Sequence, residues 1–415
     1  MTRRLPPTGI RKVKYFGSLL VMAILVVSAL AASGSTEDLR NPAFMADARK
    51  GFDQIYSLDY QDAFRTFSDL RSRNPNHPAP PLYLASVVWL RELFDRNELD
   101  LDKFIAPTYF TKPSARQMAA EDRKAFFNYL NECERLCNAV LKKDPKNAEA
   151  RYFLGSMYGV LGAFAITIDR SYSDAFSKGK KAYQHHLELI EQRPDFYDAY
   201  MSVGLYEYVV DNLPWYIKWV AVIVGYRGSQ ERGFEYLTRT ANKGIYAADD
   251  ARVLQMVLYM REKRFADAFA NVRTLHAKYP KNFILHLNQA QILEKLGKKD
   301  QAAATYREVI RLAEMKKANY QRIPLTTFRI TAARRLLRLE DFGAALASFQ
   351  TAIEDPATPQ KEKTSAHLGA GQALDRLGRR DEAVRQYQAV LRLPNLNDSH
   401  SQAREFMSRP YERAE

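Results

Sequence analysis

Residues 289–310 read QAQILEKLGKKDQAAATYREVI, a pattern typical of two helices joined by a short turn. Apolar residues up to Leu293 follow the spacing of one helix face, and the polar stretch 296–300 (LGKKD) then predicts a turn. Ala302 and Tyr306 come after the turn at a spacing of four, so they share one face of a second helix. The stretch therefore predicts a helix hairpin with a small and a bulky residue at its contact.

The same pair, a small residue with a bulky residue four positions later, recurs along the chain. In two of the copies given next, a proline follows twelve positions after the small residue. The copies are Ala63 with Phe67 and Pro75, Ala268 with Val272 and Pro280, Ala345 with Phe349, and Ala383 with Tyr387. Ala268 and Ala302 lie 34 positions apart (302 − 268), which is the period of a repeat built from two helices.

The first-helix half of the motif is present as LGSMY at 154–158, where Gly155 and Tyr158 are the small and bulky residues. Ala182 and Gly204 occupy small positions of neighbouring units. With these markers the chain resembles the tetratricopeptide repeat family over nearly all of its length after residue 32. The resemblance implies an all-α fold, an α-solenoid of about eight helix hairpins whose small residues let the paired helices approach closely.

Two hairpins depart from the repeat length in the same way. The separation from Gly155 to Ala182 is 27 residues (182 − 155) and from Gly204 to Gly233 it is 29 (233 − 204), where a standard repeat has about 12. Because both insertions are apolar, we expect elongated hairpins rather than interrupted ones. The predicted segments are a signal or anchor (1–32), N-terminal repeat helices (33–146), elongated hairpins (147–258), C-terminal repeats (259–400) and a capping tail (401–415).

The segment 212–228, NLPWYIKWVAVIVGYRG, lies in the second insertion. As a helix, its residues 213–226 would be only about 21 Å long, which is too short to cross a bilayer. Its apolar stripe consists of Trp215, Trp219, Val222, Ile223 and Tyr226. Three interpretations stay open for this stripe: packing against 159–168 (GVLGAFAITI), contact with a membrane surface, or a groove for a partner or an apolar ligand.

A narrower resemblance covers residues 148–258. The string VGLYEYVVDNLPWYIKWVAVIVGYRGSQERGFEYLTRTANKG is similar to the segment typical of the tetratricopeptide repeat domain 39 and mitochondrial inclusion-body clearance family. This resemblance implies a scaffold or adaptor without a catalytic centre, associated with membranes or lipid bodies. The chain departs from that family by its N-terminal leader and by Tyr226, where the family tends to have phenylalanine.

Residues 1–32 have the parts of an export signal. Five positive residues precede the uncharged, apolar run 15–32, namely Arg3, Arg4, Arg11, Lys12 and Lys14. The run is also just long enough to span a bilayer, so a cleaved signal and a retained membrane anchor are both open. In either case we expect the rest of the chain to be exported, free in the periplasm or held outside the cytoplasm by an inner-membrane anchor.

The chain is basic, with a net charge of +14, or +9 without the five leader charges (14 − 5). Such a surface favours an acidic protein or anionic lipid, and for an exported chain no nucleic acid is expected. The charge gathers in 307–338, where nine Lys or Arg accompany two Glu. The residues predicted to contact a partner there are Arg322, Arg329, Arg334, Arg335 and Arg338, and a solvated face is the alternative.

The sequence contains little that points to chemistry. Cys133 and Cys137 are four apart on one predicted helix, in the small and bulky positions of a repeat, so core packing is favoured over a disulfide or a metal site. The adjacent His185 and His186 diverge on a helix and do not chelate one ion together. No nucleotide-binding loop, metalloprotease or hydrolase motif is present, and we predict no catalytic, cofactor-binding or metal-binding residue.

Three hypotheses for the function follow. The first is an exported, non-catalytic scaffold that binds a protein or peptide on its concave face. The second is a membrane-anchored assembly factor whose tryptophan-rich segment touches lipid or a membrane protein. The third is a carrier of an apolar ligand, or an enzyme, with a cavity lined by Phe164, Trp215, Trp219 and Tyr226.

Overall fold

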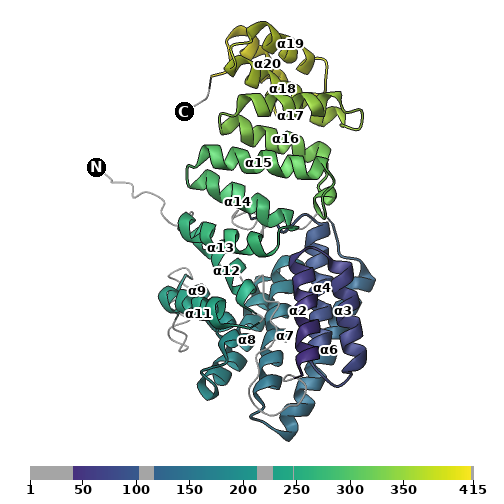
Figure 1. Cartoon of the computed structure of the whole chain (residues 1–415), viewed down its shortest axis with the longest axis vertical. Coiled ribbons are helices and arrows are strands. Elements are labelled where there is room, and N and C mark those ends of the chain that lie inside the picture. The colour runs from purple at the N-terminus through teal and green to yellow at the C-terminus, as the bar shows by residue number, and fades with distance from the viewer. Residues whose placement is uncertain (1–40, 102–115, 213–227, 246, 413–415) are drawn as a thin grey trace, which may run out of the picture. The chain divides into compact units, whose positions relative to one another are not determined.

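A computed structural model describes residues 41–101, 116–212, 228–245 and 247–412. Within these ranges the chain forms seventeen α-helices and two short 3-10 helices, and it contains no β-strand there (Figure 1). The all-α fold class predicted from the sequence is confirmed. The predicted leader, 1–32, lies outside the described residues.

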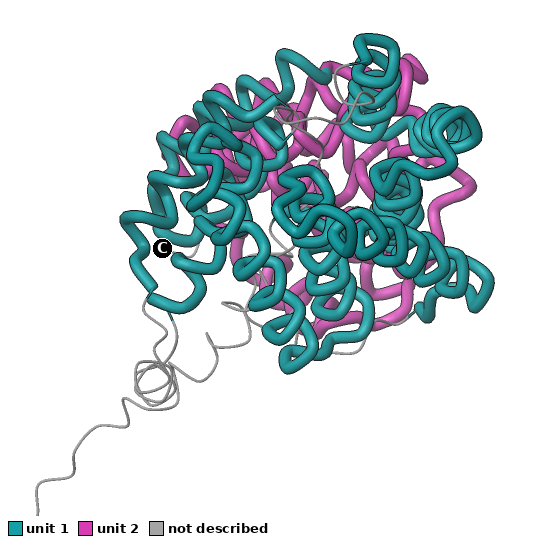
Figure 2. The backbone as a smooth tube through the Cα atoms, turned by 90° about the horizontal axis from the view of Figure 1, so that it is seen from below, with its two compact units in different colours: residues 1–279 teal, residues 280–415 magenta. Residues whose placement is uncertain are grey.

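The chain divides into two compact units, Met1–Tyr279 and Pro280–Glu415 (Figure 2). In unit 1 the helices pair in chain order as α2/α3, α4/α6, α7/α8, α9/α11 and α12/α13. Their bounds are α2 Pro42–Tyr56, α3 Tyr60–Arg73, α4 Ala79–Asp95, α6 Ala120–Lys143, α7 Ala148–Thr167, α8 Tyr172–Gln192, α9 Tyr200–Asp211, α11 Gln230–Lys243, α12 Ala248–Arg261 and α13 Phe265–Lys278, with the 3-10 helix η1 at Tyr197–Ala199.

Unit 2 continues the same paired packing as α14/α15, α16/α17 and α18/α19. Its helices are α14 Phe283–Lys295, α15 Lys299–Glu314, α16 Leu325–Arg338, α17 Phe342–Glu354, α18 Gln360–Arg376, α19 Arg380–Val390 and α20 Ser399–Ser408, with η2 at Tyr320–Arg322. α20 packs against α19 and α18 at the end of the unit, where a capping helix is expected. The described residues thus contain eight hairpins, as many as the repeat pattern predicts.

Six of the described helices begin after a residue whose side chain accepts from a backbone N–H group of the first turn, namely α2, α7, α8, α11, α14 and α17. Asn147 accepts from the backbone N–H of Ala150, and Ser229 accepts from that of Arg232. Asn282 accepts from two backbone N–H groups at the start of α14. Such caps each contribute about 1 kcal/mol to helix stability, so local sequence favours the starts of these six helices.

The turns inside six hairpins share one feature, a residue in the left-handed backbone region. These residues are Leu58, Arg170, Lys263, Gly297, Glu340 and Gly378, with φ between 56° and 73°. Only two of them are glycine, the residue for which this conformation carries no steric cost. The turn geometry is therefore conserved between hairpins although its residue type is not.

The repeat positions predicted to be small are buried where paired helices meet. Ala63, Ala182, Ala268, Ala302, Ala345 and Ala383 are at most 2% exposed. α9 and α11 approach closely: a Cβ at Gly204 would lie 2.8 Å from the carbonyl oxygen of Gly233, and the reverse distance is also 2.8 Å. The contact at this helix pair is therefore backbone to backbone, which only glycine permits at both positions.

The first predicted elongated hairpin is present, since α7 and α8 have 20 and 21 residues whereas α12 and α13 have 14 each. The insertion of the second, with residues 213–227, lies outside the described residues. No helix in the described part of the chain combines the length and the apolarity that a membrane crossing requires.

Candidate functional site

The basic residues predicted to contact a partner lie on α16 and just before it. Arg322 is the last residue of η2, and Pro324 precedes the first residue of α16. Arg329, Arg334, Arg335 and Arg338 follow on α16 itself. One helix of unit 2 thus carries four of the five predicted residues.

Part of this charge is neutralised by ion pairs with neighbouring helices. Arg329 pairs with Glu314 at 3.0 Å, and Arg335 pairs with Glu294 of α14 at 3.3 Å. Both arginine side chains are mostly buried, with 14% and 24% of their surface exposed. Tyr306 also donates to Glu294, so Arg335 belongs to a network that ties three helices together. These two arginines hold α16 in place.

Arg334 and Arg338 have a different setting because both are exposed on α16. With Thr327 and Thr331 they form a stripe of exposed residues at spacings of four, three and four, which is one face of a helix. Partial burial lowers the pKa of Arg334, and the charge of Arg338 lowers it further. An arginine still keeps its proton at neutral pH. The stripe therefore presents two like charges one turn apart, whose repulsion an acidic partner would relieve.

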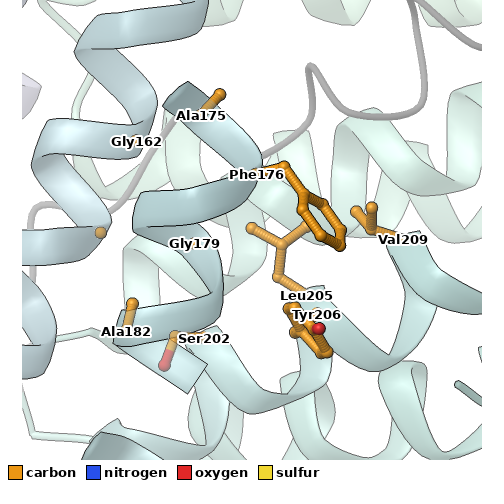
Figure 3. A pocket seen from close by; sticks show the side chains of 10 residues that line it. Gly162, Ala175, Phe176, Gly179, Ala182, Ser202, Leu205, Tyr206 and Val209 are labelled. Carbon is orange, nitrogen blue, oxygen red and sulfur yellow. The ribbon is translucent and has the colours of Figure 1, made fainter. Parts of the chain in front are cut away.

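An apolar groove lies on unit 1 between the elongated hairpin α7/α8 and α9 (Figure 3). It encloses about 490 Å³ of empty space, including its open mouth. Small residues of α7 and α8 line one side, and Phe176 of α8 with Leu205, Tyr206 and Val209 of α9 line the other. The small-residue lining consists of Gly159, Gly162, Ala175, Gly179 and Ala182. Gly179 helps to keep the groove open, since a Cβ there would meet nothing within 4 Å.

The predicted apolar contact residues do not account for this groove. Phe164 is 1% exposed and stacks on Phe126 with 4.1 Å between ring centroids, so it belongs to the core. Trp215, Trp219, Ile223 and Tyr226 lie outside the described residues. The groove residues carried only a weak sequence signal, the glycines at 159 and 162 one turn apart on α7 and Gly179 on α8.

The two adjacent histidines, His185 and His186, have different surroundings. His186 is buried, and its Nε2 lies 2.9 Å from the carbonyl oxygen of Tyr152 while Nδ1 contacts the hydroxyl of Ser202. Burial lowers the pKa of His186 to about 4, so the ring is neutral at pH 7. A Cβ at Gly155 would lie 2.4 Å from this ring, which explains why glycine stands at that repeat position. His185 instead stacks on Tyr158.

The cysteine pair is also part of the core. Cys133 and Cys137 are both completely buried on α6 and both are free thiols. Burial raises the pKa of the Cys137 thiol well above its usual value, with a further contribution from its hydrogen bond with Cys133. A thiol with a raised pKa is a poor nucleophile. Across the part of the chain that the structure describes, no group of three His, Cys, Asp or Glu residues is placed to hold a metal ion.

Two stretches of the chain, residues 255–314 and 330–398, match the family model described as tetratricopeptide repeat. Both stretches contain the small and bulky positions that are buried between paired helices. These two stretches of the chain therefore consist of tetratricopeptide repeats. The second match begins within α16 and includes Arg334 and Arg338, so both exposed arginines lie in a tetratricopeptide repeat.

Several solved structures also match the chain, all at low sequence identity. A repeat protein from Parabacteroides merdae is 14% identical, and the alignment covers 79% of this chain and 98% of that one with a TM-score of 0.29. The human IFIT1 dimer with m7Gppp-AAAA is 12% identical over 94% and 89%, with a TM-score of 0.35. The protein TTC0263 from Thermus thermophilus is 16% identical over 60% and 93%, with a TM-score of 0.19. No curated protein matches the chain.

Proposed function

We propose that this tetratricopeptide protein is a non-catalytic scaffold that binds an acidic segment of a partner protein along α16. The observation that carries the proposal is the exposed stripe of Arg334 and Arg338, whose like charges lie one helical turn apart. Tetratricopeptide arrays typically bind proteins on extended surfaces rather than catalyse reactions. Arg329 and Arg335 support this site by fixing the helix through their ion pairs.

Charge reversal at the stripe is expected to weaken binding of a fluorescein-labelled polyglutamate peptide by about tenfold, measured by fluorescence anisotropy at low salt. Exposed charge pairs contribute about 0.2–1 kcal/mol each, and a tenfold change corresponds to about 1.4 kcal/mol. The variant is Arg334→Glu with Arg338→Glu. Binding of the unchanged protein should also fall as salt is added, because screening acts on exposed charges.

The matched control is Lys142→Glu with Lys143→Glu, which changes the net charge equally at two exposed lysines at the end of α6. This variant should retain most of the binding. If both variants lost binding equally, the effect would come from the overall charge of the protein and not from the stripe. If the α16 variant lost helical content, its loss of binding would no longer support the stripe.

We further propose that the chain is exported, which rests on the basic start and apolar run of 1–32. Expression in a bacterial host with this leader and an intact-mass measurement separate two forms. A periplasmic product shortened by the leader favours a free scaffold. A full-length product that stays with membranes after a high-salt wash favours a membrane-anchored assembly factor, and a full-length cytoplasmic product contradicts export.

We also propose that the scaffold acts near membranes. This proposal rests on the resemblance of residues 148–258 to the tetratricopeptide repeat domain 39 and inclusion-body clearance family. A carrier of an apolar ligand is the alternative, favoured by the groove beside α8. Its test is the fluorescence of anilinonaphthalene sulfonate, which would increase with the native protein and not with Gly179→Phe if the groove takes apolar ligands.

A further inference from the structure

The first and the fifth hairpin of unit 1 meet through a cluster of carboxyl and tyrosine groups. The cluster consists of Asp53 and Tyr56 at the end of α2, Asp249 and Asp250 at the start of α12, and Tyr279 after α13; we call it the clasp. The hydroxyl of Tyr56 donates to Asp250. The hydroxyl of Tyr279 lies 2.7 Å from an oxygen of Asp249 and 3.2 Å from one of Asp53. The rings of Tyr56 and Tyr279 stack with 4.9 Å between centroids and 18° between planes.

These contacts join residues far apart in the sequence. Tyr56 and Asp250 are separated by 194 residues, and Asp53 and Tyr279 by 226. In a repeat array each hairpin ordinarily contacts only its neighbours. The clasp therefore closes unit 1 from its first hairpin to its fifth, a closure that the packing of neighbouring hairpins does not require.

The two adjacent aspartates of the clasp have different environments. Asp249 has two cationic partners, Lys278 at 2.6 Å and Arg252 at 3.2 Å. Asp250 is 3% exposed, one of its carboxyl oxygens has no hydrogen-bond partner, and no ion pair to it is present among the described residues. The charged groups that act on it are Asp249 on its own helix and Asp198 of η1. The carboxylate of Asp198 is held by the backbone N–H of Ala247 at 2.8 Å.

We propose that the clasp is a proton-dependent lock, which closes unit 1 while Asp250 carries a proton and loosens when Asp250 becomes a carboxylate. A buried carboxylate without a cation beside it is unfavourable, and two further carboxylates nearby increase the cost. The neutral acid avoids both costs and still accepts the hydrogen bond from Tyr56.

The electrostatics of the clasp support this assignment. Burial raises the pKa of Asp250 well above its usual value, the hydrogen bond from Tyr56 acts in the opposite direction, and the charges of Asp249 and Asp198 raise the pKa further. Burial and then the charge of Asp250 raise the pKa of Tyr56, so this tyrosine keeps its proton at neutral pH. Asp250 is therefore the group of this hydrogen-bonded pair that titrates.

The sign of the pH dependence follows from the raised pKa. An exposed aspartate has a pKa of about 3.9, and in the closed state that of Asp250 is higher. Closure is then fully favoured at pH values below the exposed pKa, and it is progressively lost as the pH rises toward and through the raised pKa. Rising pH should open the clasp.

The test is hydrogen–deuterium exchange of the full-length protein, followed by mass spectrometry of peptides from α2 between pH 5 and pH 8. After correction for the intrinsic exchange rate, exchange in α2 should increase at least tenfold across this range. In Asp250→Asn, which cannot ionise, the increase should be less than twofold. Asp375→Asn in unit 2 replaces another carboxyl that accepts a tyrosine hydroxyl, and it should leave the response of α2 unchanged.

A second variant covers the case in which Asp250→Asn does not fold. Tyr56→Phe removes the donor to Asp250, so α2 should exchange faster at every pH and its pH dependence should persist. Exchange in α2 of the unchanged protein that is independent of pH would overturn the proposal. So would an Asp250→Asn variant that keeps the full response, or a Tyr56→Phe variant that loses it.

Discussion

Gly204→Val is expected to destabilise unit 1 by about 3 kcal/mol or more, because the new side chain would meet backbone that cannot move aside. The Cβ position at Gly204 lies 2.8 Å from the carbonyl oxygen of Gly233 and 3.2 Å from the backbone nitrogen of Leu237. Overpacking typically costs about 1–3 kcal/mol, and α9 and α11 would have to separate along their length. For a unit of this size the loss lowers the unfolding midpoint by about 6–12 °C, which circular dichroism on heating measures.

Gly179→Ala is the matched control, since this glycine also lies inside a helix but its Cβ would meet nothing within 4 Å. Alanine there should stabilise the protein by about 0.5–1 kcal/mol, the usual gain when an unconstrained helical glycine is replaced. A Gly204→Val protein as stable as the unchanged one would show that α9 and α11 do not approach closely.

Glu92→Ala is expected to cost about 3–5 kcal/mol because it leaves a buried arginine without its partner. Glu92 in the last turn of α4 pairs at 2.6 Å with Arg96, the residue that follows the helix, and their side chains are only 4% and 3% exposed. Without the carboxylate the guanidinium of Arg96 stays out of water with its charge uncompensated. Urea unfolding followed by circular dichroism measures the loss.

An exposed pair with the same spacing provides the control. Glu235 and Arg239 on α11 also pair at 2.6 Å, but their side chains are about half exposed. Glu235→Ala should cost no more than about 0.5 kcal/mol. Replacing both buried residues, Glu92→Leu with Arg96→Leu, should recover most of the stability. If the double variant were as unstable as Glu92→Ala, the cost would come from packing instead of charge.

The sequence predicts the fold well because its markers are local. A small residue and a bulky residue four positions later define each hairpin contact, and Ala302 with Tyr306 or Ala383 with Tyr387 are buried as that pattern requires. The left-handed turns were harder to predict from the sequence, since residue types such as Leu58 and Glu340 do not indicate the positive φ that they adopt. Their conformation is imposed by the packing of the two helices that they join.

The candidate site was only partly predictable. Counting charges located the basic stretch on α16, but the sequence does not reveal that Arg335 pairs with Glu294, 41 residues away. The separation of exposed from paired arginines depends on tertiary contacts. The groove could not be predicted either, because it depends on how the small residues of α7 and α8 face α9. The clasp could not be predicted because its residues share no local sequence pattern.

The clasp also bears on how the chain is made. Asp53 is synthesised 226 residues before Tyr279, the residue whose hydroxyl donates to it in the clasp. At about 5–20 residues per second, roughly ten to forty-five seconds separate the two events. During that interval α2 can pair with α3 and form its own hairpin, but the clasp cannot form. Unit 1 therefore completes its fold only when its last helix has been synthesised. In nascent chains that end before Tyr279, the first hairpin lacks part of its contact with the fifth.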